Sequence, residues 1–330
     1  MDLRAGPGEQ PPAPSLSRLR LVAEPPDVQA KGGRVPTGSL ALLIHVGGET
    51  RRAGRDDLFD FPRLGRYSGN MDPVAFRIGA TAIYWYGVMV ALGFLAGLWT
   101  ASRRAPLAGI SGEAVADLGF WLVISALLGA RLFYVVEYWQ EDFADKPLWQ
   151  TLNLRAGGLV FYGGLIGGAL AVLAYTRLKR LPLWKLADVL APSVSLGHAF
   201  GRIGCFLNGC CYGKACSLPW AVHFPPEHIT HGAGVHPTEL YEAGVNLILY
   251  AVLARWFRRR GFDGQVFALY LIGYGGARFV IEFFRGDYER YYLGGWATPG
   301  HLVSAIAVAC GVVLYRWRRA QSVGEETVGR

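Results

Sequence analysis

Long apolar blocks alternate with short polar segments from about residue 71 to residue 319. Each of seven blocks is close to the roughly 20 residues that a helix needs to cross a bilayer. The pattern predicts transmembrane helices over Ala82–Ser102, Ala114–Val136, Gly157–Thr176, Leu186–Gly204, Thr238–Ala254, Gly264–Phe284 and Gly300–Tyr315. We therefore expect an all-α polytopic membrane protein whose seven-helix domain spans residues 71–319.

Residues 1–70 lack this pattern. Their longest apolar run, Leu40–Ile44, is too short to cross a membrane. The segment is rich in Pro, Gly, Arg and Asp, and its ten Lys and Arg make it a poor candidate for export without a signal. We predict that residues 1–70 are a disordered extension, or that Met71 is the physiological start. Residues 320–330 are predicted to form a cytoplasmic tail.

Composition supports the membrane interpretation, because 52% of the residues are hydrophobic and only 18% are charged. The 33 Lys and Arg exceed the 25 Asp and Glu, but they gather just outside the apolar blocks, which argues against nucleic acid as a partner. Most of them share one side: Arg103, Arg104, Arg177, Lys179, Arg180, Lys185, Arg255, Arg258, Arg259, Arg260, Arg316, Arg318 and Arg319. The positive-inside rule then puts the C-terminus in the cytoplasm, the N-terminus outside and residues 201–214 near the outer leaflet.

Two predicted helices carry arginines at membrane depth, Arg202 and Arg278. Each such charge costs about 2.5–3.5 kcal/mol on insertion scales, so Arg202 needs an anionic partner or a wet cavity. Tyr274, Arg278 and Glu282 are spaced four residues apart and share one helix face. Two guanidinium groups on the same side fit a phosphodiester. The plainer alternatives are a glycine-rich packing corner with one snorkelling arginine for residues 197–214, and an ion pair of Arg278 with Glu282 that only holds helices together.

Acidic side chains at the start of the fifth predicted helix have a local explanation. Thr238 is a reasonable N-cap, and Glu239 and Glu242 suit the positive end of the helix. We therefore predict a capping role for both acids.

Other polar residues are weaker candidates. Tyr86 lies deep enough in the first predicted helix for its hydroxyl to need a partner. Arg131 is a further cation predicted at membrane depth. It could belong to the site, or it could pair with Glu137 or with a helix C-terminus. Tyr162 stands among glycines that indicate close helix packing, and its phenol is predicted either to pack there or to enter a cavity.

Four of the five cysteines crowd into one loop: Cys205, Cys210, Cys211 and Cys216. Their spacing lacks the paired C-x₂₋₄-C pattern of zinc sites, so no metal is predicted. One disulfide is compatible with an oxidising compartment, and a catalytic thiol also stays open.

Six motifs in this order carry a family resemblance: Tyr84-Trp85-Tyr86-Gly87, Gly129-Ala130-Arg131-Leu132, the glycine-rich run 158–168, Gly201-Arg202-Ile203-Gly204-x-Phe206-Leu207-Asn208-Gly209, His236-Pro237-Thr238-Glu239-Leu240-Tyr241-Glu242, and Tyr274 through Arg285. Across residues 71–319 the chain resembles the bacterial prolipoprotein diacylglyceryl transferases. The resemblance implies a bacterial cytoplasmic (inner) membrane enzyme without a cofactor. It would transfer an sn-1,2-diacylglyceryl group from phosphatidylglycerol to the lipobox cysteine thiol of exported preprolipoproteins, releasing glycerol 1-phosphate.

The resemblance also implies site residues. Arg202 and Arg278 match the arginines that hold the donor headgroup. The substrate-binding positions carried over or taken from the motifs are Tyr86, Arg131, Cys205, Asn208, Gly213, Tyr274 and Glu282. Four positions depart from the usual pattern, namely Tyr162 in place of histidine, Cys205 and Cys210 in place of Asn and Glu, and Lys214 in place of arginine.

Because of these departures, the identity of the general base stays open. A tyrosine, with an ordinary pKa of about 10, is a poor base unless it is already ionised, whereas a histidine near 6.5 can accept a thiol proton. Tyr162 beside Arg202, His198 or His236 could serve, or the arginine field alone could favour the thiolate. The departures also leave room for a paralogue with another acceptor. A non-enzymatic phospholipid-binding or transport protein is the alternative from another class.

Overall fold

The computed structural model describes residues 72–79, 81–144, 146–153, 157–287, 292 and 297–328. The predictions for residues 1–70 and for Met71 lie outside this range. Long helices occur at the seven predicted places: α1 Trp85–Arg104, α2 Gly112–Glu137, α3 Phe161–Leu178, α4 Leu183–Leu207, α5 Thr238–Trp256, α6 Gln265–Glu282 and α7 Pro299–Val328. α7 thus continues well past Tyr315, where the apolar block ends.

The all-α expectation needs a small correction, because two short hairpins accompany the helices. β1 (Val74–Ile78) pairs antiparallel with β2 (Thr81–Tyr84), and β3 (Val222–His223) pairs antiparallel with β4 (Gly234–Val235). The first predicted helix therefore begins at Trp85 instead of Ala82. The β-branched Thr81 and Ile83 and the aromatic Tyr84 suit a strand, and the backbone N–H of Trp85 donates to the Pro73 carbonyl at 2.9 Å.

Length and hydropathy divide the helices into two groups. Within the described residues, four helical segments are long and apolar enough to cross a membrane: Trp85–Ala108, Gly112–Glu137, Phe161–Leu178 and Pro299–Gly324. The remaining long helices, α4, α5 and α6, carry charged residues such as Arg202, Glu242 and Arg278, which lower their mean hydropathy. The chain is thus a mostly helical membrane protein whose more polar helices contain the candidate site residues.

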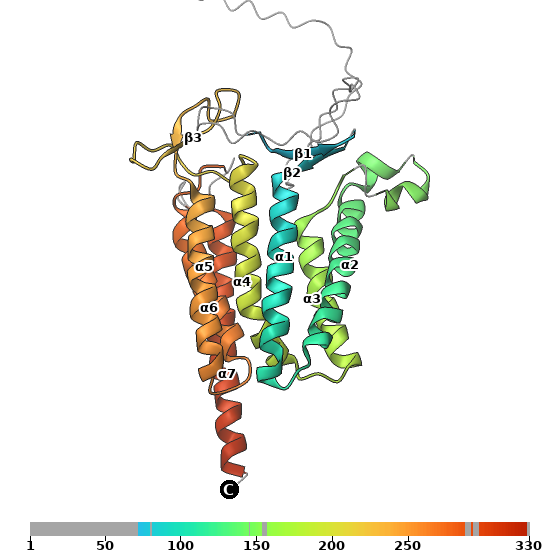
Figure 1. Ribbon diagram of the computed structural model, residues 1–330, viewed down its shortest axis with the longest axis vertical. Helices are drawn as coiled ribbons and strands as arrows, with labels where there is room; N and C mark the ends of the chain where they lie inside the picture. The colour runs from blue at the N-terminus through green and yellow to red at the C-terminus, as the bar shows by residue number, and fades with distance from the viewer. Residues whose placement is uncertain are drawn as a thin grey trace, which may run out of the picture. The chain divides into compact units, whose positions relative to one another are not determined.

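Helix α4 is at the centre of the packing, because it contacts α1, α5 and α6 (Figure 1). A side chain at Gly93 of α1 would lie 2.7 Å from the Phe200 Cβ and 3.0 Å from the Gly197 carbonyl of α4. The absence of a side chain at Gly93 therefore brings the backbones of α1 and α4 close together. α6 packs in turn against α7.

Helices α2 and α3 form a second close pair. A Cβ at Gly163 would lie 2.3 Å from the Gly129 carbonyl, which supports the packing interpretation of the glycine-rich motif. We expect Gly163→Ala to lower the free energy of unfolding by about 1–3 kcal/mol through overpacking, measured by thermal unfolding in detergent. Gly244→Ala is the matched control, since a Cβ on this α5 glycine meets nothing within 4 Å. A Gly163→Ala protein as stable as Gly244→Ala would contradict the expectation.

The candidate residues and the basic clusters lie at opposite ends of the helix bundle. The C-terminal ends of α4 and α6 and the N-terminal end of α5 lie at the end of the bundle that bears the strands (Figure 1). The basic residues at the ends of α1, α3 and α5 (Arg103, Arg104, Arg177 and Arg255) lie at the opposite end. Arg202 and Arg278 therefore share the end that is poorer in positive charge.

Candidate active site

Glu242 on α5 is the centre of the polar cluster and is only 2% exposed. Its Oε2 lies 3.1 Å from Nε of Arg202 on α4 and 3.2 Å from Nη1 of Arg278 on α6. Its Oε1 lies 3.0 Å from Nε2 of His198 and accepts a bond from the Tyr274 hydroxyl at 3.4 Å. One carboxylate thus joins three helices, which brings together four residues that the sequence singled out.

The contact between His198 Nε2 and Glu242 Oε1 favours one tautomer of His198. Nε of Arg202 lies 3.1 Å from His198 Nε2 as well as from Glu242 Oε2. A single nitrogen cannot accept from Arg202 and donate to Glu242 at once. We assign the proton of a neutral His198 to Nε2, which donates to Glu242, and this leaves Nδ1 with its lone pair. The ring of Tyr274 contacts the imidazole at 5.0 Å between centroids and helps to fix its orientation.

Arg278 is held from a second side by Glu282, whose Oε2 lies 2.6 Å from its Nη2. The Thr298 hydroxyl donates to Oε1 of Glu282 at 2.6 Å and lies 3.0 Å from Nδ1 of His301. The predicted ion pair between Arg278 and Glu282 is therefore present. Arg278 is shared by two carboxylates, whereas Arg202 contacts Glu242 through Nε.

Arg202 keeps binding capacity for an anion. In the described part of the chain, no hydrogen-bond acceptor contacts its Nη1 or Nη2, and its side chain is 18% exposed. Arg278 is 12% exposed, and its Nε has no partner among the same residues. Because the planar guanidinium presents several N–H groups as a fork, these free positions can bind phosphate oxygens without breaking the contacts to Glu242.

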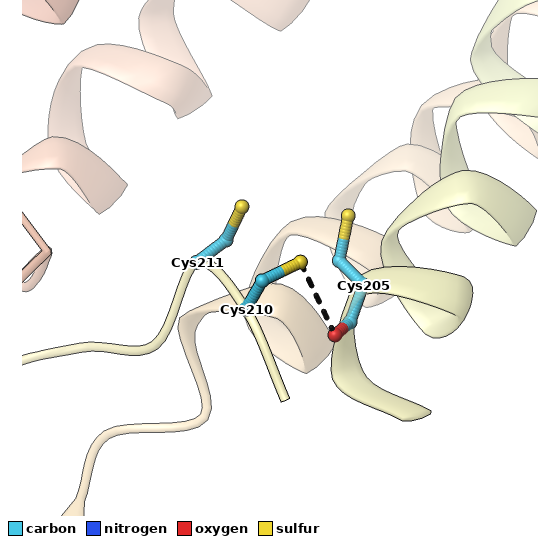
Figure 2. Close-up of side chains that lie close together, drawn as sticks. All are labelled: Cys205, Cys210 and Cys211. Carbon is cyan, nitrogen blue, oxygen red and sulfur yellow. Dashed lines mark hydrogen bonds between the residues drawn. The ribbon is translucent and has the colours of Figure 1, made fainter. Parts of the chain in front are cut away.

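The turn after α4 brings further candidates beside Arg202. Asn208 is the C-cap of α4, and its N–H donates to the Gly204 carbonyl at 3.0 Å. The Sγ atoms of Cys205, Cys210 and Cys211 lie close together, and Cys210 Sγ donates to the Cys205 carbonyl at 3.6 Å (Figure 2). The pKa of Cys211 is lowered, because the Cys205 and Cys210 thiols hydrogen-bond to its sulfur and because Arg285 and Arg202 are positive.

Gly213 and Tyr86 border the same region. Gly213 donates its N–H to the His236 carbonyl at 2.9 Å and bridges to Arg285. A side chain at Gly213 would lie 2.6 Å from His236 Cβ and 2.7 Å from the Phe284 carbonyl, so no larger residue fits. Tyr86 on α1 packs against α4, since a Cβ on Gly204 would lie 3.3 Å from the Tyr86 ring.

Three predicted residues are not joined to the arginine cluster. Tyr162 is at the start of α3, which packs against α2; it is 46% exposed, and its ring contact is with Phe161. Arg131 of α2 donates to the carbonyls of Gln150, Thr151, Gly157 and Gly158 at 2.6–3.1 Å, and not to Glu137. It therefore closes the α2–α3 loop. Nδ1 of His236 lies 3.2 Å from the Tyr241 hydroxyl, away from the arginines.

The capping prediction for α5 is wrong in two respects. Pro237 is the N-cap and Thr238 is the first helical residue, whose hydroxyl donates to the Cys211 carbonyl at 2.9 Å. Glu242 lies beyond the first turn and pairs with the arginines instead of the helix end. Charge balance could have found it, because two arginines predicted to lie at membrane depth need an anion and Glu242 is predicted on the same side. Thr298 was also missed, since it carries no signal of its own.

Comparison with known proteins decides the family. The sequence model described as prolipoprotein diacylglyceryl transferase matches residues 73–317, which is most of the chain. The chain belongs to this family.

Relatives named phosphatidylglycerol–prolipoprotein diacylglyceryl transferase share substantial identity with this transferase. The protein of Photobacterium profundum is 38% identical over 252 residues, covering 75% of this chain and 93% of the relative. That of Finegoldia magna is 36% identical over 245 residues, covering 74% and 94%. That of Chromohalobacter salexigens is 35% identical over 265 residues, covering 78% and 96%. The predicted family is therefore confirmed, and the relatives align over nearly their whole length.

Proposed function

We propose that this enzyme transfers an sn-1,2-diacylglyceryl group from phosphatidylglycerol to the lipobox cysteine thiol of preprolipoproteins and releases glycerol 1-phosphate. Membership of the prolipoprotein diacylglyceryl transferase family supports this activity. The observation that carries the mechanism is the pair Arg202 and Arg278 on one buried carboxylate, Glu242. Glu242 fixes both guanidinium groups in place before substrate binds, and their unused N–H groups bind the phosphate of the donor lipid.

The chemistry follows from the bond that must break. The thiolate sulfur attacks the diacylglyceryl carbon bonded to the phosphate oxygen; a carbon–sulfur bond forms and the carbon–oxygen bond breaks. The electron pair stays on the oxygen of the departing glycerol 1-phosphate. Arg202 and Arg278 stabilise the negative charge that grows on this phosphate in the transition state, which lowers the barrier more than ground-state binding does.

We assign the thiol proton to Nδ1 of His198. The bond from His198 Nε2 to Glu242 supports this role, because the carboxylate holds the imidazole in the tautomer that accepts at Nδ1 and stabilises the imidazolium. Tyr162 is a poorer candidate, since α3 packs against α2 and the phenol is not joined to the cluster. The proton then passes to the product phosphate or to water, which restores neutral His198.

Substitution of His198 tests this assignment. His198→Gln is expected to lower kcat by about 10²- to 10⁴-fold with little change in KM for phosphatidylglycerol, as general-base loss does. Tyr162→Phe is the comparison, and we expect it to retain kcat within a few-fold. Transfer to a lipobox peptide, followed at several concentrations of phosphatidylglycerol, gives kcat and KM separately for each variant. If Tyr162→Phe loses activity and His198→Gln does not, the two roles are exchanged.

We also propose seven spans, with the N-terminus outside, the C-terminus in the cytoplasm and the site toward the outer leaflet of the bacterial cytoplasmic membrane. The clusters of Lys and Arg at the opposite end of the bundle support this orientation. Packing of α4 against α1 and of α6 against α7, with α5 packed against both α4 and α6, supports spanning by these three as well. Cysteines introduced at Arg103 and at Trp220 should react with an impermeant maleimide only from the cytoplasmic and the outer side, respectively.

The activity itself is tested in cells. The full chain is expressed in bacteria depleted of their own transferase, and lipid-modified prolipoprotein is followed by its gel shift and mass. We expect rescue by the wild type and none by Arg202→Ala or Arg278→Ala. Absence of rescue by the wild type, at normal levels in the membrane, would favour another acceptor.

A further inference from the structure

Three thiols converge at the end of α4. The Sγ atoms of Cys205, Cys210 and Cys211 all lie within 4.8 Å of one another, and none forms a disulfide (Figure 2). Sequence spacing alone gave no metal prediction, because the pattern C-x₄-C-C does not match paired zinc motifs. The fold nevertheless brings these three thiols close together.

The backbone builds this convergence in a strained turn. The N–H of Cys210 donates to the Cys205 carbonyl at 3.1 Å, which folds the chain back over the last turn of α4. Gly209 and Cys211 both have left-handed backbones, with φ of 70° and 71°. That conformation costs a non-glycine residue roughly 1–2 kcal/mol, yet a cysteine occupies the second position. The Thr238 hydroxyl holds its carbonyl at 2.9 Å.

We propose that Cys205, Cys210 and Cys211 form a three-thiolate site for a soft monovalent metal ion such as Cu⁺. Thiolates select soft ions, and in a trigonal site with metal–sulfur bonds of about 2.3 Å the sulfurs lie about 4 Å apart, which fits the observed limit. Structural Zn²⁺ almost always takes four ligands. Within the described ranges no histidine or carboxylate joins this group of three.

Binding of Cu⁺ to the three thiols balances in charge and in atoms. One Cu⁺ displaces up to three thiol protons and forms three copper–sulfur bonds, with no change in oxidation state. The product has a net charge of about −2. Arg202, one turn before Cys205 on α4, and Arg285, which bridges to Gly213, place positive charge beside the thiolates. This three-thiolate site does not depend on the proposed transferase function.

Titration of the purified full chain with Cu⁺ under anaerobic conditions tests the proposal. A chromogenic Cu⁺ chelator serves as competitor, and X-ray absorption reports the ligands. We expect one ion per chain with three sulfur neighbours. Cys205→Ser and Cys210→Ser should each weaken binding by at least about 100-fold, since even outer-shell losses cost 10- to 100-fold. Cys310→Ser, in an exposed position on α7, is the matched control and should bind normally.

Cys211→Gly removes the third ligand without a risk to folding, because glycine adopts φ of 71° freely. It should bind Cu⁺ as weakly as Cys205→Ser while unfolding at or above the wild-type temperature. Substoichiometric binding by the wild type, or unchanged binding by Cys211→Gly, would overturn the proposal. A disulfide between any two of the three cysteines, found by mass spectrometry in protein taken directly from the membrane, would overturn it as well.

Discussion

Arg202→Gln is expected to lower kcat/KM for phosphatidylglycerol by about 10³-fold while leaving the fold intact. The neutral amide removes a positive charge and the two unbonded Nη groups that we assign to the lipid phosphate. Loss of one oriented donor to a developing negative charge typically costs 10²- to 10³-fold, and Arg202 supplies both a donor fork and a full charge. Transfer of diacylglyceryl to a fluorescent lipobox peptide in mixed micelles measures the effect.

Arg202→Lys separates charge from geometry. Lysine retains the positive charge but cannot contact Glu242 and a phosphate with one rigid fork. We therefore expect an intermediate loss of about 10²-fold, mostly in kcat, because the phosphate is bound but not aligned.

Arg104→Gln is the matched control for both variants. Arg104 is also a buried arginine, but it lies at the other end of α1, where Nη1 donates to the Val189 carbonyl at 2.8 Å and to the Ser193 hydroxyl at 3.2 Å. Its removal should lower the unfolding temperature and leave kcat/KM nearly unchanged. The phosphate-binding role would be refuted by a folded Arg202→Gln enzyme within tenfold of the wild type.

The helical part of the fold was accessible from the sequence because bilayer thickness restricts each spanning helix to a narrow range of lengths. Helix α4 was expected at Leu186–Gly204 and occurs at Leu183–Leu207. The strand at Thr81–Tyr84 was missed, since its apolar residues continue without interruption into α1. Whether α4, α5 and α6 cross the bilayer stays a prediction.

The candidate site could be predicted from the sequence only in part. The four-residue spacing of Tyr274, Arg278 and Glu282 placed them on one face, and the structure keeps Arg278 paired with Glu282. The role of Glu242 was not found, because local reasoning assigned every acid near a helix start to the helix dipole. Its actual partners come from α4 and α6, and such contacts depend on helix packing that sequence spacing within one element does not reveal.

The cysteine cluster illustrates a different limit. Convergence of Cys205, Cys210 and Cys211 depends on two left-handed residues in the turn after α4. A glycine such as Gly209 predicts such a backbone, but a cysteine does not. The alternative that places Tyr162 beside Arg202 stays a prediction, and the pairing of α3 with α2 gives it no support.

Glu242→Gln is the second large effect that we expect, and it acts on stability and catalysis together. Glutamine keeps the size of the side chain but removes the negative charge that faces Arg202 and Arg278 at 3.1 and 3.2 Å. Breaking a buried ion pair on one side typically costs about 3–5 kcal/mol, because the remaining charges are left without compensation. We therefore expect a clear fall in unfolding temperature in detergent.

Catalysis should respond in kcat more than in KM. Without the carboxylate, the guanidinium groups gain free N–H donors for phosphate, so binding of phosphatidylglycerol is retained. Their positions are no longer fixed, and His198 loses the acceptor that selects its tautomer. A fall in kcat of about 10²-fold with an unchanged or lower KM is the expected result, and it is measured with the same peptide assay.

Glu239→Gln separates this role from the general loss of a buried acid. Glu239 lies three residues earlier on α5 and is 1% exposed, and among the described residues neither of its carboxylate oxygens has a hydrogen-bond partner. Because the substitution breaks no hydrogen bond found among the described residues, this variant should unfold near the wild-type temperature. If Glu239→Gln and Glu242→Gln destabilise the protein equally, Glu242 has no special part in holding the arginines. If only Glu242→Gln loses both stability and kcat, the shared carboxylate is the group that organises the site.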